Sequence, residues 1–189
     1  MSSKQLVIFA SGNGSNAVRI CEHFQNNSLV AVTHVFSNNP KANVFQRLRP
    51  FQIPGRCFSR EDLQTGVVLN SLKSINPDLI VLAGFLLKIP QSIIHAFPKK
   101  IINIHPSLLP KYGGKGMYGV HVHQAVKDNK ESETGITIHY VNEAYDQGAI
   151  IFQAKVTVSA DATVLGISQK VQQLEHEHYP LVIAQLLSP

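Results

Sequence analysis

Short, mostly apolar runs alternate with helical patterns through the first half of the chain. Four of these runs are four to seven residues long: 6–10, 30–36, 79–83 and 101–104. Such runs are typical of parallel strands that are buried on both faces. Helical patterns fall between them, and a shorter strand is predicted at 52–58. This alternation predicts right-handed βαβ units and a Rossmann-like α/β fold, with helices flanking a mostly parallel, twisted sheet.

The pattern changes in the last third of the chain. A helix is predicted over 120–129, and residues 135–141 then alternate apolar and polar side chains, which favours a strand nearer the sheet edge. A further strand at 149–158 would pair with it in antiparallel orientation. We therefore expect a single domain over residues 1–189 with an antiparallel C-terminal strand pair.

Polar and special residues predict where several helices begin and end. A helix over 40–49 and one over 60–74 are expected, the second capped by Ser59. The final helix is predicted to begin at Asp161 or Thr163 and to run to about residue 187. Since Pro180 falls inside it and proline lacks an N–H group, we expect a kink or a break there.

Composition and charge limit the possible functions. The net charge of +5 favours anionic ligands such as phosphates and carboxylates. The densest basic cluster is the pair Lys99-Lys100, which is too little for a nucleic-acid surface. Residues 6–10 are too short for a signal-peptide core or a membrane span, and Cys21 and Cys57 form no C-x-x-C motif. We expect a cytoplasmic protein with neither nucleic-acid nor membrane partners.

A glycine-rich turn follows the first strand. Gly12, Gly14 and Ala17 match G-x-G-x-x-G/A, and the N-terminus of the following helix offers free N–H groups to a phosphate. A dinucleotide site would require an acid after the second strand, where Ser37-Asn38-Asn39 has none. We therefore expect one phosphate of a mononucleotide here rather than NAD. The alternative is an ordinary N-cap turn.

The strand at 101–104 carries the strongest candidates for chemistry. Asn103 and His105 are two residues apart, so their side chains point the same way on an extended chain. Pro106 then ends the strand, so a carboxamide and an imidazole stand at a strand end, suited to a developing oxyanion. Asp146 offers a carboxylate to orient the imidazole or raise its pKa. The alternative is a buried asparagine and a core histidine that satisfy backbone groups.

Five segments, taken in order, give the chain a resemblance to a known family. They are 11–16 (SGNGSN), 82–85 (LAGF), 103–112 (NIHPSLLPKY), the run Gly135-x-Thr137-x-His139-x-Val141 leading to Asp146-x-Gly148, and Gln172-x-x-Glu175-His176-x-x-Tyr179-Pro180. Over nearly the whole chain they resemble the folate-dependent phosphoribosylglycinamide formyltransferase family. The resemblance implies formyl transfer from 10-formyltetrahydrofolate to the glycine amine of glycinamide ribonucleotide in purine biosynthesis, without a metal.

The resemblance also implies a role for each part of the site. Asn103 and protonated His105 would stabilise the oxyanion, and Asp146 would support the histidine and the proton transfer. The ribonucleotide would bind mainly to the N-terminal half, at Gly12, Asn13, Gly14, Ser15, Asn16, Gln172 and Glu175. The folate would bind with the catalytic residues in the C-terminal half, at Leu86, Leu87, Lys88, Ile89, Asn103, Val141, Asn142, Glu143 and Asp146.

The histidine pairs need a separate interpretation. His121-x-His123 and His176-x-His178 have an i, i+2 spacing that points to different sides of a helix, and no carboxylate or cysteine cluster accompanies them, so we expect no metal site. We expect the glycine-rich segment 111–119 to be a mobile loop over the site, and its part 114–118 is longer than the corresponding loop in many relatives. The histidine alignment is therefore ambiguous, and His121 and His123 are second-rank site candidates.

Two other functions fit part of the pattern. A formyltetrahydrofolate hydrolase has the same catalytic residue types, but it usually carries an N-terminal regulatory domain, and here the fold is expected to begin at Leu6. A non-catalytic nucleotide-binding module would hold a phosphate and would not need Asn103 or His105. A monomer and a homodimer are both compatible with the sequence.

Overall fold

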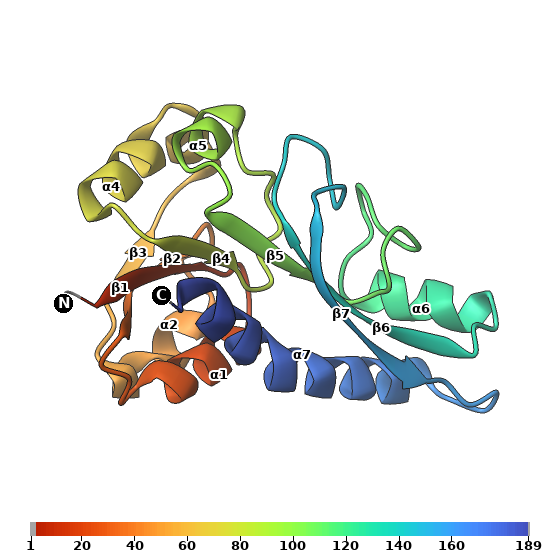
Figure 1. The fold of residues 1–189 in the computed structure, drawn as a ribbon. Coiled ribbons are helices and arrows are strands. Elements are labelled where there is room, and N and C mark those ends of the chain that lie inside the picture. The colour runs from red at the N-terminus through yellow and green to blue at the C-terminus, as the bar shows by residue number, and fades with distance from the viewer. Residues whose placement is uncertain (1–2, 189) are drawn as a thin grey trace.

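Residues 3–188, which the computed structural model describes, form a seven-stranded sheet in the order β3-β2-β1-β4-β5-β6-β7 (Figure 1). The first five strands run parallel, whereas β6 pairs antiparallel with both β5 and β7. This confirms the predicted mostly parallel sheet with an antiparallel C-terminal strand pair. The strands are β1 (Lys4–Phe9), β2 (Val30–Ser37), β3 (Gly55–Cys57), β4 (Leu79–Leu82), β5 (Ile101–His105), β6 (Glu133–Tyr140) and β7 (Ile150–Thr157).

Helices cover both faces of the sheet, as Figure 1 shows. One face packs against α1 (Ser15–Phe24), α2 (Asn43–Arg47), α6 (Val120–Asp128) and α7 (Val164–Leu187). The other packs against α3 (Arg60–Gln64), α4 (Val67–Ile75) and α5 (Gln91–Ala96). Within residues 3–188, no helix has the length and apolar character needed to cross a membrane.

The central strand β1 shows why its sequence is an unbroken apolar run. Leu6 and Ile8 pack into the core beneath α1 and α7, whereas Val7 and Phe9 pack into the core beneath α4 and α5. Successive side chains of a strand point to opposite faces, so a strand with a core on each side has no position left for a polar residue.

Three predicted boundaries are wrong, each for a local reason. The helix expected over 60–74 is two helices, because Gly66 adopts a left-handed φ of 92° between α3 and α4. The helix expected over 40–49 is reduced to α2 and a 3-10 turn (Arg49–Phe51), since Pro50 disfavours helical backbone just before it. The strand expected at 52–58 shortens to β3 because Gln52 has a left-handed φ of 55°.

Helix boundaries set by side-chain caps are confirmed. Ser59 and Asp62 form a reciprocal capping box at α3, and Thr163 caps α7 by accepting a bond from the Gly166 amide at 3.0 Å. Helix α7 continues through Pro180, so the alternative of a break there is wrong. Figure 1 shows α7 changing direction in its last turns, where proline removes a helix hydrogen bond.

The order of the strands in the sheet reverses beside β1, and the carboxyl ends of β1 and β4 meet at this point. Strand β1 has β2 on one side and β4 on the other, so the connections leaving it diverge and open a crevice. The buried Ser11 links the segments there: its hydroxyl donates to Asn38 Oδ1 at 2.6 Å and accepts from the Leu86 amide at 3.0 Å. The glycine-rich turn therefore starts from a fixed point.

The buried hydroxyl of Tyr179 provides a test of how α7 is held to the sheet. It donates to the Leu82 carbonyl at 3.0 Å from a fully buried ring. Tyr179→Phe should lower the free energy of unfolding by about 1–2 kcal/mol, because the ring stays and a buried acceptor loses its donor. Urea denaturation measures this, with the exposed Tyr118→Phe as the matched control. Equal stability of Tyr179→Phe and the parent protein would contradict the prediction.

Candidate active site

The pairing of β5 with β6 gathers polar side chains on one face of the sheet. Asn103 lies opposite His139, and His105 lies opposite Thr137. Directly opposed side chains share a face, so these four form one patch. Thr137, His139 and His105 are buried. The polar positions of β6 therefore face the interior of the site rather than solvent.

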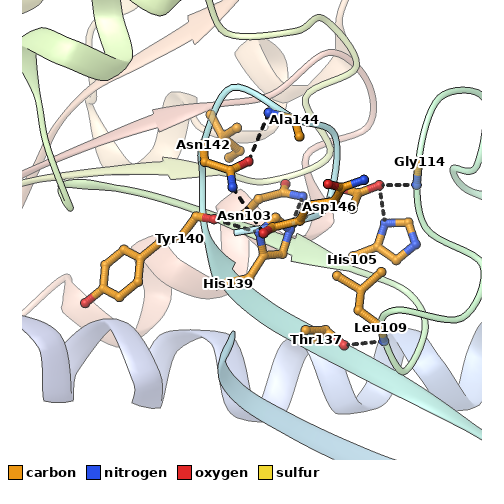
Figure 2. A network of polar contacts seen from close by, with 12 residues as sticks. Asn103, His105, Leu109, Gly114, Thr137, His139, Tyr140, Asn142, Ala144 and Asp146 are labelled. Atoms are coloured by element: carbon orange, nitrogen blue, oxygen red, sulfur yellow. Dashed lines mark hydrogen bonds and ion pairs between the residues drawn. The ribbon is translucent and has the colours of Figure 1, made fainter. Parts of the chain in front are cut away.

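Asp146 brings a carboxylate to this patch from the loop between β6 and β7. Its Oδ2 lies 3.5 Å from Nδ1 of His105 and accepts a hydrogen bond of 2.9 Å from the Gly114 amide, as Figure 2 shows. On the other side of the ring, His105 Nε2 donates to the carbonyl of Tyr112 at 2.8 Å. A carbonyl only accepts, so this bond places a hydrogen on Nε2 and turns Nδ1 toward the carboxylate.

Burial and charge act in opposite directions on this pair. Burial lowers the pKa of His105 below its ordinary value, and the raising effects of Asp146 and of the Tyr112 carbonyl do not outweigh it. Burial raises the pKa of Asp146, but the hydrogen bond from the Gly114 amide and the field of His105 bring it below its ordinary value. At neutral pH the free site therefore holds an ionised Asp146 beside a mostly neutral His105.

His139 fixes the orientation of the Asn103 carboxamide. His139 Nδ1 donates to the Tyr140 carbonyl at 2.8 Å, which leaves Nε2 as an acceptor 3.2 Å from Asn103 Nδ2. Nε2 also lies 3.7 Å from Asp146 Oδ1. One amide hydrogen of Asn103 is thus used inside the protein, and the other is available to a ligand oxygen.

The glycine-rich turn has the geometry of an anion site. Gly14 is the N-cap of α1 with a left-handed φ of 72°, and no side chain among residues 3–188 caps the helix. A Cβ at this position would meet Val44 Cγ2 at 2.4 Å, so only glycine fits. The first N–H groups of α1 therefore have no side-chain partner at the N-cap and are open to a ligand.

Two side chains of α7 reach the start of α1. Gln172 donates to the Ser15 hydroxyl at 3.3 Å, and Glu175 Oε2 accepts from Asn16 Nδ2 at 2.9 Å. Burial raises the pKa of Glu175, which the bond from Asn16 opposes. The other amide atom, Asn16 Oδ1, is buried without a partner in the described part of the chain and can accept from a ligand.

A cavity of about 690 Å³ joins these parts. Its lining includes every predicted ribonucleotide residue and the three predicted catalytic residues. From the predicted folate set it includes Leu86, Asn103 and Asp146. It also includes the unpredicted residues Ala83, Tyr118, Tyr145, Ser168 and Val171. The other predicted folate residues lie outside this lining: Leu87, Lys88, Ile89, Val141, Asn142 and Glu143.

Contacts of those outer residues show what they do in the free protein. Ile89 is buried in the core on the α5 side. Glu143 accepts from Gln91 and lies 2.9 Å from His95 Nε2, so it ties the Asp146 loop to α5. The Asn142 carboxamide bonds to backbone groups of its own loop. Their contact with a folate stays a prediction.

The second-rank histidines separate as their spacing predicts. His123 is 4% exposed and lines the cavity, whereas His121 is exposed and packs against the Tyr118 ring. The loop residues Gly114–Gly119 also line the cavity. In the chain from residue 3 to residue 188, no group of three or more His, Cys, Asp or Glu side chains is placed to hold a metal ion.

Two partners of the candidate catalytic side chains were not predicted from the sequence. The contact of His139 with Asn103 depends on the β5–β6 register, and its sequence signals are its polar position in an alternating strand and its place in the segment Gly135-x-Thr137-x-His139-x-Val141. The Tyr112 carbonyl is a backbone group, which side-chain patterns do not reveal.

Comparison with known proteins shows which family the chain belongs to. The family model described as formyl transferase matches residues 4–183. The phosphoribosylglycinamide formyltransferase of Bacillus subtilis is 35% identical over 97% of this chain and 95% of its own length. The chloroplastic enzyme of that name from Arabidopsis thaliana is 36% identical over 97% of this chain, which spans 65% of that protein.

Solved structures agree as well. Glycinamide ribonucleotide transformylase 1 from Geobacillus kaustophilus superposes with a TM-score of 0.89 at 33% identity, covering 98% of this chain and 100% of the other. With a family model that spans nearly the whole sheet and a relative matched over almost its full length, the chain belongs to the formyl transferase family.

Proposed function

We propose that this protein transfers a formyl group from 10-formyltetrahydrofolate to the glycine amine of glycinamide ribonucleotide, a step of purine biosynthesis. The observation that carries the proposal is a single cavity with an anion site at Gly12–Asn16 and the Asn103, His105 and Asp146 cluster in its wall. A phosphate-bearing amine and an acyl donor can meet there. The cytoplasmic location and the choice between monomer and homodimer stay predictions.

The ribonucleotide would bind across α1 and α7. Its phosphate would accept from the open N–H groups after Gly14 and from the Ser15 hydroxyl. Its ribose hydroxyls would donate to Glu175 and to the unpartnered Asn16 Oδ1. So bound, the ribonucleotide would have its glycine amine in the same cavity as the β5–β6 patch.

The residues present also fit a folate. The cavity volume is within the range of small-molecule sites, and apolar and aromatic side chains from Leu86, Tyr118 and Tyr145 line it together with the catalytic group. Lys88 lies 5.4 Å from the Tyr145 ring centroid, just beside this part of the lining. A bound 10-formyl folate would supply the formyl carbon that the amine attacks.

Asn103 and His105 would stabilise the negative charge that develops on the formyl oxygen. The free amide hydrogen of Asn103 would donate to it, and the growing charge would raise the pKa of His105, so that the imidazole takes up a proton from water and becomes a second donor. Asp146 would stabilise the resulting imidazolium and, through water, accept the proton that the amine loses. When the tetrahedral intermediate collapses, the bond between the formyl carbon and N10 of the folate would break, the proton from the amine would pass through water to N10, and His105 would give up its extra proton. Removing one such donor typically costs about 10²–10³ in turnover.

The direct test is a spectroscopic assay with purified protein and a 10-formyl folate, with and without glycinamide ribonucleotide. Deformylation that requires the ribonucleotide supports the transferase. Deformylation without it would indicate the hydrolase, and no reaction in either case would favour a nucleotide-binding module. His105→Ala should lower turnover by about 10²-fold or more while ribonucleotide binding, measured by calorimetry, changes little.

Ser15→Ala tests the placement of the phosphate. Loss of the hydroxyl should weaken ribonucleotide binding about tenfold, the effect expected when a hydrogen bond to a charged group is removed, and should leave folate binding unchanged. Calorimetry with each ligand separately measures both. Ser168→Ala, another hydroxyl in the cavity lining, is the matched control. Equal losses for the two ligands would argue against the assignment.

Asp146→Asn tests the electrostatics of the pair. Since burial lowers the pKa of His105 and the Asp146 charge raises it, removing that charge should lower the pKa of His105 further. His105 would then stay neutral to more acidic pH. NMR titration of the His105 ring in the free protein measures the shift, with Asp128→Asn on α6 as the control. An unchanged or raised midpoint would contradict the prediction.

A further inference from the structure

Glu131, in the turn between α6 and β6, holds a segment that contacts the catalytic histidine. One carboxylate oxygen accepts from the Tyr112 hydroxyl at 2.9 Å, and the two oxygens accept from Lys111 Nζ at 2.9 and 3.0 Å. The Glu131 side chain is 22% exposed and that of Lys111 is 65% exposed. The contact with the tyrosine is therefore the better shielded of the two.

Tyr112 connects this anchor to the site. Its carbonyl accepts from His105 Nε2 at 2.8 Å, and its backbone has a left-handed φ of 56°. A non-glycine residue in this conformation is strained and persists only where its surroundings hold it. The Ser107 hydroxyl, which donates to the Lys111 carbonyl at 2.6 Å, holds the preceding peptide, and Glu131 holds the ring.

We propose that Glu131 is a positioning residue for His105. Through the Tyr112 hydroxyl it holds the strained Tyr112 backbone, whose carbonyl keeps the hydrogen of His105 on Nε2 and turns Nδ1 toward Asp146. Glu131 is outside the cavity lining and contacts no reacting atom. The kinetic part of this inference rests on the proposed function, whereas its structural part concerns the free protein alone.

If the Tyr112 carbonyl were displaced, the pKa, tautomer and orientation of the His105 ring would depend on the other groups that face it. Asp146 lies on the Nδ1 side, the carbonyl lies on the Nε2 side, and His139 and His123 approach from β6 and α6. Asp146 and the carbonyl raise the pKa of His105, and His139 lowers it. Without the carbonyl the ring loses its only backbone acceptor among the described residues, and both its tautomer and its orientation become mixed.

The first test reads the His105 ring by ¹⁵N NMR in the ligand-free protein. Glu131→Ala and Tyr112→Phe should convert a dominant Nε2–H tautomer into a mixture and move the titration midpoint to lower pH. Glu131→Gln, which keeps an acceptor for the hydroxyl, should stay closer to the parent protein. Glu133→Ala is the matched control, because Glu133 forms a comparable exposed pair with Lys155 at 2.9 Å only two residues away.

The second test is kinetic. Glu131→Ala and Tyr112→Phe should lower kcat about tenfold with KM for the ribonucleotide unchanged, since small misplacements of a catalytic group reduce turnover rather than binding. Thermal midpoints confirm that each variant is folded. Since the NMR test needs no substrate, it decides the proposal even if the assay shows no formyl transfer.

Three results would overturn the proposal. The first is an unchanged His105 tautomer and midpoint in both Glu131→Ala and Tyr112→Phe. The second is an equal effect from Glu133→Ala, which would show that any charge removed from this surface acts in the same way. The third is a loss in Glu131→Gln as large as in Glu131→Ala, which would mean that the hydroxyl contact does not carry the effect.

Discussion

The antiparallel pairing of β5 with β6 is the constraint on which the site depends. In an otherwise parallel sheet, this pairing sets Asn103 against His139 and His105 against Thr137. A shift of one residue would turn the β6 polar positions to the other face and place apolar side chains in the site. Gly148 helps the following loop to fold back, because a Cβ there would meet the Tyr140 carbonyl at 1.6 Å. Asp146 is thereby held over the patch.

Backbone strain occurs on both sides of the His105 imidazole. Tyr112 and Asp146 have left-handed φ values of 56° and 54°, and each supplies one partner of His105. Such strain is stored at functional sites where the surrounding structure over-determines it. Here the surrounding contacts are visible: Thr137 donates to the Ser107 carbonyl at 2.7 Å, and the Gly114 amide donates to Asp146. His105 is thus held from both sides of its ring, by the Tyr112 carbonyl and by Asp146.

The sequence predicts those parts of the fold that depend on local pattern. The buried strands follow from apolar runs such as 6–10, and the capping box at Ser59 follows from residue type and spacing. The split between α3 and α4 was missed because Gly66 tolerates a helical context as well as the left-handed turn it adopts. Spacing along one strand likewise placed Asn103 and His105 together, and the structure has both in the cavity lining.

The pattern of residues along the sequence could not predict features that depend on strand register or on the path of a loop. The bond between His139 and Asn103 requires the pairing of two strands 36 residues apart. Ile89 lies in the segment between β4 and α5, and the sequence did not show that its side chain is buried in the core on the α5 side. The position of a residue along the chain can predict that its segment lies near a site. The direction of its side chain depends on the packing around it.

The cavity draws its lining from the whole length of the chain, from Gly12 to Glu175, and α7 closes it by reaching back to α1. No partly unfolded form that has lost α7 or the β5–β6 pair retains a complete binding site. A ligand therefore stabilises the entire fold by mass action, by about 2.7 kcal/mol when its free concentration is a hundred times its Kd. A ligand bound in this cavity therefore lowers the population of opened forms that a protease can cleave.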